Sequence, residues 1–105
     1  MNIEKEVSPG KSLYNGHTTV GLTAVPLANK FPTTRGILLR CPGSLDPTPN
    51  TACVWVGGKG VTADSAATGG MPIAPGSHLV LPVDDASAIY VISTAADQDV
   101  AWMGV

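Results

Sequence analysis

The glycine-rich run Gly57-Gly58-Lys59-Gly60 comes nearest, in composition and spacing, to a motif that binds a ligand. A phosphate-binding loop needs G-x-x-x-x-G-K-[ST] between a strand and a helix, and a dinucleotide loop needs G-x-G-x-x-G at the start of a helix. Here Lys59 is followed by Gly60 and the β-branched Val61, and neither spacing is present. We therefore expect a tight turn between strands, in which Gly57, Gly58 and Gly60 adopt positive φ.

The histidines are too few for a metal centre. A cupin-like site uses about three histidines and a glutamate from neighbouring strands. This chain has only His17 and His78, and its only glutamates, Glu4 and Glu6, lie near the N-terminus. We expect no metal and no other cofactor.

Cys41 and Cys53 fall on consecutive expected strands, and they could face each other if those strands pair as a hairpin. Their spacing matches no zinc signature. A nucleophilic cysteine needs a base or a helix N-terminus to lower the pKa of its thiol, and the sequence offers neither. Structural thiols are the favoured interpretation, and a disulfide formed outside the cytosol is the alternative.

The carboxylates are also poorly arranged for catalysis. Asp84 and Asp85 are adjacent, so on a strand they would point to opposite faces. The segment PVDDAS is more typical of a turn in which aspartates accept hydrogen bonds from backbone N–H groups. No serine lies in a nucleophile-elbow context. We expect that the protein is not an enzyme.

The aromatic residues Trp55, Tyr90 and Trp102 fall on three expected strands. Packing in the core is the favoured role. An aromatic platform for sugars is the alternative, but it would need polar neighbours that CVWVG and VAWMG do not supply.

The elements that position these residues are expected to be strands. A chain of 105 residues with 12 glycines, 9 prolines and only 13% charged residues is typical of one all-β domain with many short strands. We predict a single antiparallel β-sandwich over residues 17–105, preceded by an irregular N-terminal arm at residues 1–16. The expected strands are 17–25, 35–41, 52–57, 77–83, 88–94 and 99–105, with short ones near Val61 and Ile73.

Charge restricts the choice of partners. The net charge is −2 and no basic stripe exists, so we expect no binding to nucleic acid. No apolar stretch is long enough to span a membrane, and the charged N-terminus does not resemble a secretory signal, so we expect synthesis in a cytosol. Because few charges keep the surface hydrated, we expect a homo-oligomer, a trimer or a dimer, and a neutral monomer rich in Thr and Ser is the alternative.

The segments RGILLRC, ACVWVGGKGVTA, GGMPIAPGSHLVLPVDD, AIYVIST and DVAWMGV together resemble small structural proteins of tailed bacteriophages. The resemblance covers residues 35–105 and departs from the family pattern at CPGSLDPTPNTAC. It implies a jelly-roll-like sandwich on the virion, with a head decoration (cement) protein as the best match and a tail or fibre module as another possibility. It carries no catalytic residues. The positions it matches are structural turns: Gly57, Gly58, Pro75, Gly76, Asp84 and Asp85.

This resemblance implies a place on the capsid surface after synthesis in the host bacterial cytoplasm. We hypothesise that the arm, through Ile3, Val7 and Leu13, and the 42–50 loop, through Leu45, bind the major capsid protein. The alternative function is a tail-fibre or receptor-binding module that holds glycan. That module would expose Trp55 or Trp102, whereas a decoration protein would bury both.

Overall fold

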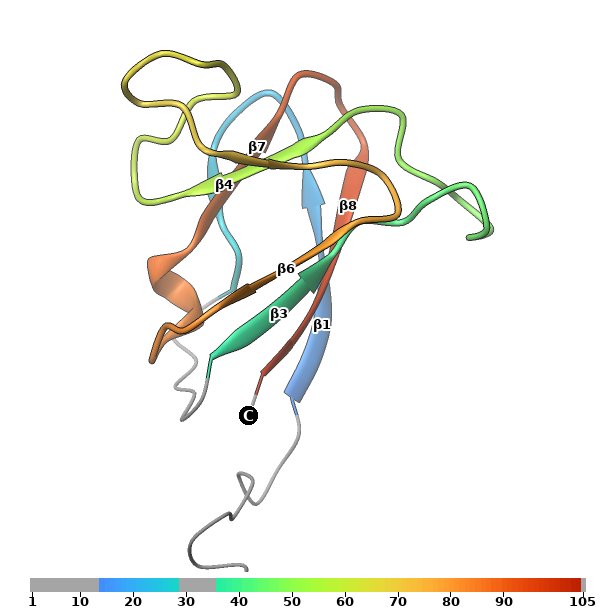
Figure 1. The fold of residues 1–105 in the computed structure, drawn as a ribbon, viewed down its shortest axis with the longest axis horizontal. Coiled ribbons are helices and arrows are strands. Elements are labelled where there is room, and N and C mark those ends of the chain that lie inside the picture. The colour runs from blue at the N-terminus through green and yellow to red at the C-terminus, as the bar shows by residue number, and fades with distance from the viewer. Residues whose placement is uncertain (1–13, 29–35, 105) are drawn as a thin grey trace, which may run out of the picture.

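The computed structural model describes residues 14–28 and 36–104, which form eight strands and one short 3₁₀ helix (Figure 1). The elements, in chain order, are β1 (Tyr14–Val20), β2 (Val25–Pro26), β3 (Ile37–Arg40), β4 (Val54–Gly57), β5 (Met71–Ile73), β6 (His78–Leu81), η1 (Ala86–Ala88), β7 (Tyr90–Ser93) and β8 (Gln98–Gly104).

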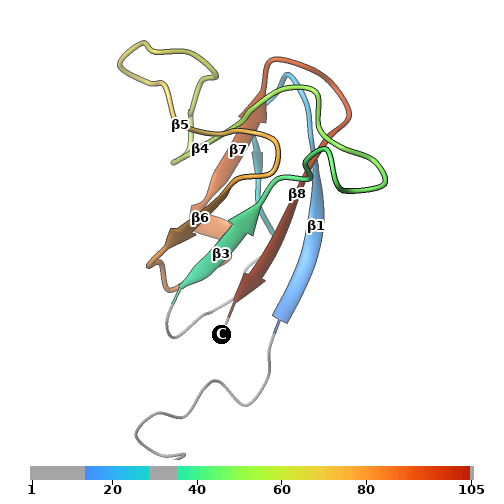
Figure 2. The same cartoon turned by 45° about the vertical axis from the view of Figure 1, so that its right-hand side comes forward.

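The strands form two four-stranded antiparallel sheets that pack face to face (Figures 1 and 2). Sheet A has the order β1-β8-β3-β6 and sheet B the order β2-β7-β4-β5. Within the described chain, β4 and β5 are the only consecutive strands that pair with each other, because every other connection passes from one sheet to the other. The all-β sandwich is therefore confirmed. The strand order is compatible with a jelly roll, which stays a prediction.

The first expected strand, 17–25, is two strands in different sheets. β1 begins earlier, at Tyr14, and ends at Val20, whereas Val25 starts β2 in sheet B. The chain turns between them at Gly21, whose carbonyl accepts a 2.8 Å hydrogen bond from the N–H of Ser93 at the end of β7. Residues 14–16 of the expected arm are thus strand, and the rest of the arm lies outside the described residues.

Alternate residues of both sheets point inward and form one apolar core. Strand β3 shows the pattern plainly, since Ile37 and Leu39 are buried while Leu38 and Arg40 are exposed. Each large aliphatic side chain that is fully buried contributes roughly 1.5–3 kcal/mol. The largest fully buried side chains are Leu27, Ile37, Leu39, Val20, Val54, Val91, Val100 and Cys41.

The GGKG segment is a turn, but its glycines differ from the expectation. Gly60 has φ of +87°, and the N–H of Val61 donates to the carbonyl of Gly58 over 3.1 Å. Gly57 and Gly58 do not adopt positive φ. A Cβ on Gly57 would lie 2.7 Å from Val61 Cγ2, so close packing explains this glycine, while Gly58 has open space around it. The whole segment 58–70 joins β4 to β5, so the connection is longer than a tight hairpin.

The other expected turn residues lie at two connections. Gly76, with φ of +85°, follows Pro75 between β5 and β6 and donates from its N–H to the carbonyl of Cys41 over 2.8 Å. Asp85 follows Asp84 and caps η1, because its carboxylate accepts hydrogen bonds from the N–H and the hydroxyl of Ser87 at 2.9 and 2.8 Å.

Candidate partner-binding surface

The outer face of sheet A carries an apolar row across three strands. Leu38 lies opposite Met103 of β8 on one side and Val80 of β6 on the other. Their exposed fractions are 39%, 43% and 60%. Side chains opposite one another on one face of a sheet are within contact distance, so these three form a continuous apolar surface.

A second row beside it carries basic side chains. The register places His17, Ala101, Arg40 and His78 side by side across the four strands. His17 Nδ1 donates to Asp99 Oδ2 over 2.7 Å. Arg40 donates twice to the Asp46 carboxylate, over 3.2 and 3.0 Å. Two of the three basic side chains are thus paired with acids.

The pairing of Arg40 with Asp46 favours the charged form of both groups. The hydrogen bonds that Arg40 donates to Asp46 raise the pKa of the Arg40 guanidinium. The hydrogen bonds from Arg40 and from the Gly43 N–H lower the pKa of the Asp46 carboxyl below its usual range. The ion pair therefore persists into mildly acidic solution.

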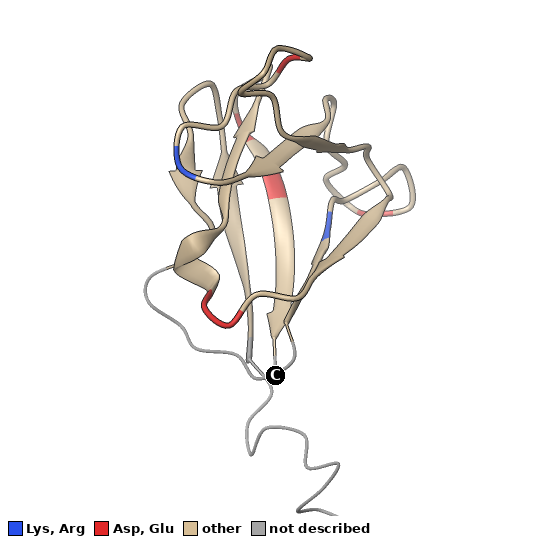
Figure 3. Cartoon of the chain, turned by 60° about the vertical axis from the view of Figure 1, so that its left-hand side comes forward, with Lys and Arg blue, Asp and Glu red and all other residues tan. Residues whose placement is uncertain are grey.

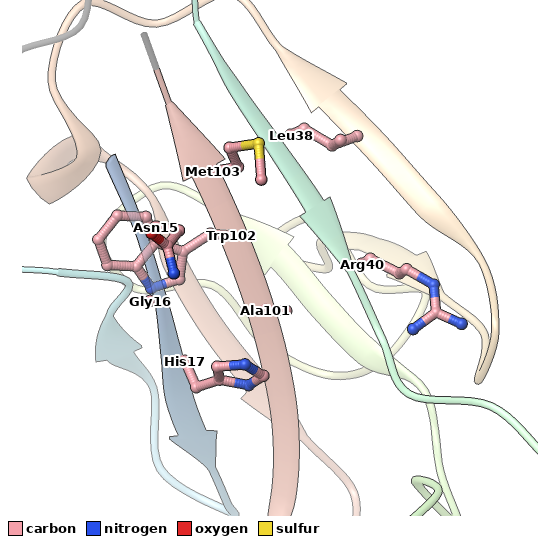
Figure 4. A pocket seen from close by; sticks show the side chains of 8 residues that line it. All are labelled: Asn15, Gly16, His17, Leu38, Arg40, Ala101, Trp102 and Met103. Carbon is pink, nitrogen blue, oxygen red and sulfur yellow. The ribbon is translucent and has the colours of Figure 1, made fainter. Parts of the chain in front are cut away.

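A shallow depression of about 250 Å³ lies where the two rows meet. Figure 4 shows its side chains on the adjacent strands β1, β8 and β3, with the apolar Leu38 and Met103 at one end and His17 at the other. The residues around it include Asn15, His17, Leu38, Arg40, Trp102 and Met103. A side chain of a partner protein that has both apolar and polar groups could fit into this depression.

The 42–50 loop adjoins this face and presents Leu45, of which 97% is exposed. The loop is held near Leu45 by a turn in which the N–H of Asp46 donates to the Gly43 carbonyl over 2.9 Å. The Gly43 N–H in turn donates to Asp46 Oδ2 over 2.7 Å. Asp46 also receives the hydrogen bonds from Arg40 on sheet A, so the exposed leucine stands on an anchored turn.

The far end of the loop is fastened to β8 by two buried amide side chains. Asn50 donates from Nδ2 to the Asp99 carbonyl over 2.7 Å and accepts from the Asp99 N–H over 2.8 Å. Gln98 Oε1 accepts from the N–H groups of Thr51 and Ala52, at 2.8 and 3.0 Å. An ordered loop loses little conformational entropy when it binds, which favours its use in recognition.

We call the outer face of β1, β8, β3 and β6 together with the 42–50 loop the sheet A surface. Figure 3 shows that Lys, Arg, Asp and Glu occupy only a few positions of the described chain. Among the residues predicted to bind a partner, Leu45 lies on this surface, whereas Ile3, Val7 and Leu13 are outside the described residues. The predicted partner-binding residues do not include the apolar row Leu38, Val80 and Met103, whose only local signal is the alternation of β3 and β6.

The cysteines do not face each other across a hairpin, because β3 and β4 belong to different sheets. Both thiols are free. Burial raises the pKa of the Cys41 thiol to about 11, which disfavours the reactive thiolate. These observations support a structural role for Cys41.

Both tryptophans are partly buried. Trp102 packs against the core, and its Nε1 donates to Thr18 Oγ1 over 3.2 Å. Trp55 is on the outer face of sheet B, where Pro72 and Ile92 flank it in register. Neither is the fully exposed platform that the glycan alternative requires, and neither is completely enclosed.

Within residues 14–28 and 36–104, no group of three or more His, Cys, Asp or Glu is arranged to hold a metal ion. The same part of the chain contains no helix long and apolar enough to cross a membrane. Comparisons with protein-family models, with curated proteins and with solved structures find no match. Function is therefore inferred from the sandwich fold, the sheet A surface and the sequence resemblance alone.

Proposed function

We propose that the protein is a non-enzymatic structural component of a tailed-phage virion, a decoration protein that binds the outer surface of the major capsid protein and stabilises the shell. The observation that carries the proposal is the sheet A surface, in which an apolar row adjoins an anchored loop with an almost fully exposed Leu45. Such a surface has no evident use in an isolated chain but suits attachment to another protein.

The chemistry of the surface suits a broad protein contact. Leu38, Val80 and Met103 release water when covered, at roughly 25 cal/mol for each Å² of apolar area. Arg40 keeps its acidic partner Asp46, so covering it does not leave an unpaired charge. A specific interface typically buries about 800 Å² on each partner, and many copies on one shell multiply a modest contact.

Stabilisation of the shell follows from mass action. A protein that binds assembled capsid subunits but not free ones shifts the equilibrium toward the shell. At a concentration 100 times its Kd, each site contributes about 2.7 kcal/mol. A rigid sandwich with an anchored contact loop is well suited to this role, because little ordering is needed on binding.

The experiment is a titration of purified protein against phage shells that lack it, with copies counted at saturation. We expect saturable binding with a fixed number of copies per capsid subunit. Leu45→Ser should weaken binding about tenfold, as is common for an anchor residue. Leu22→Ser is the matched control, since this leucine is also exposed, at 66%, but lies in the β1–β2 connection. Absence of binding by the unaltered protein would overturn the proposal.

The second candidate function is a tail-fibre or receptor-binding module that recognises glycan. One feature favours it: Trp55 and Tyr90 are diagonal neighbours on the outer face of sheet B and both are partly exposed. A sugar stacked there would quench tryptophan fluorescence, and Trp55→Phe would remove most of that response. Binding to shells together with no quenching by host glycans would favour decoration.

A further inference from the structure

Strand β1 leaves a long, regular edge at one side of sheet A. It pairs with β8 over all 7 of its residues, in continuous register from Tyr14 opposite Gly104 to Val20 opposite Gln98. Its other edge has no backbone hydrogen-bond partner among the described residues. Figure 2 shows β1 as the border strand of the sheet beside β8.

The other three edges of the sandwich carry features that discourage pairing with a further strand. β2 has 2 residues and includes Pro26, and β5 has 3 residues with Pro72 at its centre. β6 has 4 residues and is followed by Pro82. Proline lacks the N–H that a sheet ladder needs, and natural proteins protect their edges by such means. β1 has no proline, no lysine and no bulge.

We propose that β1 pairs with β1 of a second copy of this chain, antiparallel about a twofold axis perpendicular to sheet A, to form one eight-stranded sheet. A second copy fits because the strand is complementary to itself. Opposite residues in an antiparallel pair must point to the same face, so the axis must pass through a residue position. With His17 on the axis, every residue of β1 has a partner.

This register gives compatible side-chain pairs. On the outer face, Asn15 lies opposite Thr19 of the second copy, so an amide faces a hydroxyl. On the inner face, Gly16 lies opposite Thr18 of the second copy, and both residues are small. The strand contains no Lys, Arg, Asp or Glu, so its pairing brings no fixed like charges together. The two His17 side chains meet at the axis, each already bonded to Asp99 of its own chain.

The dimer has a consequence for attachment, although it does not depend on the proposed function. Because the axis is perpendicular to the sheet, both sheet A surfaces point the same way. Two copies could then engage one underlying protein surface at the same time, and simultaneous engagement raises the effective affinity by orders of magnitude. The dimer itself is tested on the full-length protein alone, without shells.

The first experiment is sedimentation velocity over a range of concentrations, with Asn15→Lys, Thr19→Lys and the double variant. We expect the mass of two chains for the unaltered protein. In the proposed register the double variant places two lysine pairs directly opposite each other across the axis, whereas each single variant places lysine opposite a neutral residue. The double variant should raise the dissociation constant of the dimer about fivefold more than the product of the two single-variant effects.

The second experiment is oxidative crosslinking of His17→Cys. On the twofold axis the two introduced cysteines would have Cα atoms about 4.5–5.5 Å apart, within the range for a disulfide. Thr19→Cys is the control, since its two copies would lie roughly 14 Å apart along the strands. The unaltered chain controls for Cys41 and Cys53. A monomer at all concentrations overturns the proposal, and so does a dimer in which His17→Cys crosslinks no better than Thr19→Cys.

Discussion

The side chain of Asn50 takes the place of a strand beside Asp99. Its amide donates to the Asp99 carbonyl over 2.7 Å and accepts from the Asp99 N–H over 2.8 Å, as a neighbouring backbone would. β3 ends at Arg40, opposite Ala101, so Asn50 continues the ladder along β8 beyond the end of its partner strand. One buried amide thereby satisfies the β8 backbone and holds the end of the 42–50 loop.

Replacement of this side chain should therefore affect both stability and binding. Asn50→Ala leaves the N–H and carbonyl of Asp99 without these partners, and we expect a loss of about 1–3 kcal/mol in the free energy of unfolding. Urea denaturation measures the loss. Thr48→Ala, in the exposed part of the same loop, is the control and should change stability by less than about 0.5 kcal/mol. If both variants unfold at the same urea concentration, the Asn50 contacts do not hold the loop.

The glycine at position 16 of β1 makes room for the Trp102 ring. An added Cβ would lie 2.6 Å from the ring atom Cζ2, far inside van der Waals contact. We expect Gly16→Ala to cost about 1–3 kcal/mol and to shift the tryptophan fluorescence spectrum, because the ring must move. Gly21→Ala is the matched control, since nothing lies within 4 Å of its added Cβ. Equal melting temperatures for the two variants would contradict this packing.

The buried Cys41 thiol should make stability depend on pH in alkaline solution. Burial raises its pKa from 9.0 to about 11, so the folded protein retains a proton that the unfolded chain releases. Between pH 9 and pH 11 the unfolded state therefore binds fewer protons, and the free energy of unfolding falls as pH rises. Chemical denaturation along this range measures the slope.

Comparison with a variant that lacks the Cys41 thiol isolates the contribution of this thiol. Cys41→Ser removes the titrating group while it keeps a side chain of similar size. The free energy of unfolding of this variant should therefore decline less between pH 9 and pH 11 than that of the unaltered protein. Groups that titrate equally in both proteins cancel in the difference. Parallel curves for the two proteins would mean that the thiol titrates alike in folded and unfolded chains.

Local patterns predicted the strands, while long-range pairing determined the surface. The apolar and polar alternation in SHLVLPV has the period of a strand, and in the structure His78 and Val80 face outward while Leu79 and Leu81 face inward, because period two depends only on neighbours in sequence. His17 and Asp99 meet because Thr19 pairs with Asp99, which places His17 on the diagonal. No local signal encodes a register between strands at opposite ends of the chain.

Two features of the chain differ from what its local sequence suggests, and for the same reason. Cys41 and Cys53 could face each other only if their strands paired as a hairpin, and this hairpin does not form because consecutive strands here mostly lie in opposite sheets. Gly57 was expected at positive φ, but the segment to β5 is long and the glycine instead avoids a clash with Val61. In both cases the chain's path between sheets, rather than its local composition, decided the outcome.

Adjacent leucines of β3 provide the last prediction, because one faces the core and the other faces the sheet A surface. Leu39 is fully buried, whereas Leu38 is 39% exposed. Leu39→Ala should cost about 2–5 kcal/mol, the usual range for a cavity in a core, and Leu38→Ala less than about 1 kcal/mol. Thermal or urea unfolding of the two variants gives the comparison. Leu38→Ala should at the same time weaken attachment to shells, since it removes the centre of the apolar row between Met103 and Val80. The opposite stability order would mean that β3 faces the other way, which would remove the apolar row from the surface.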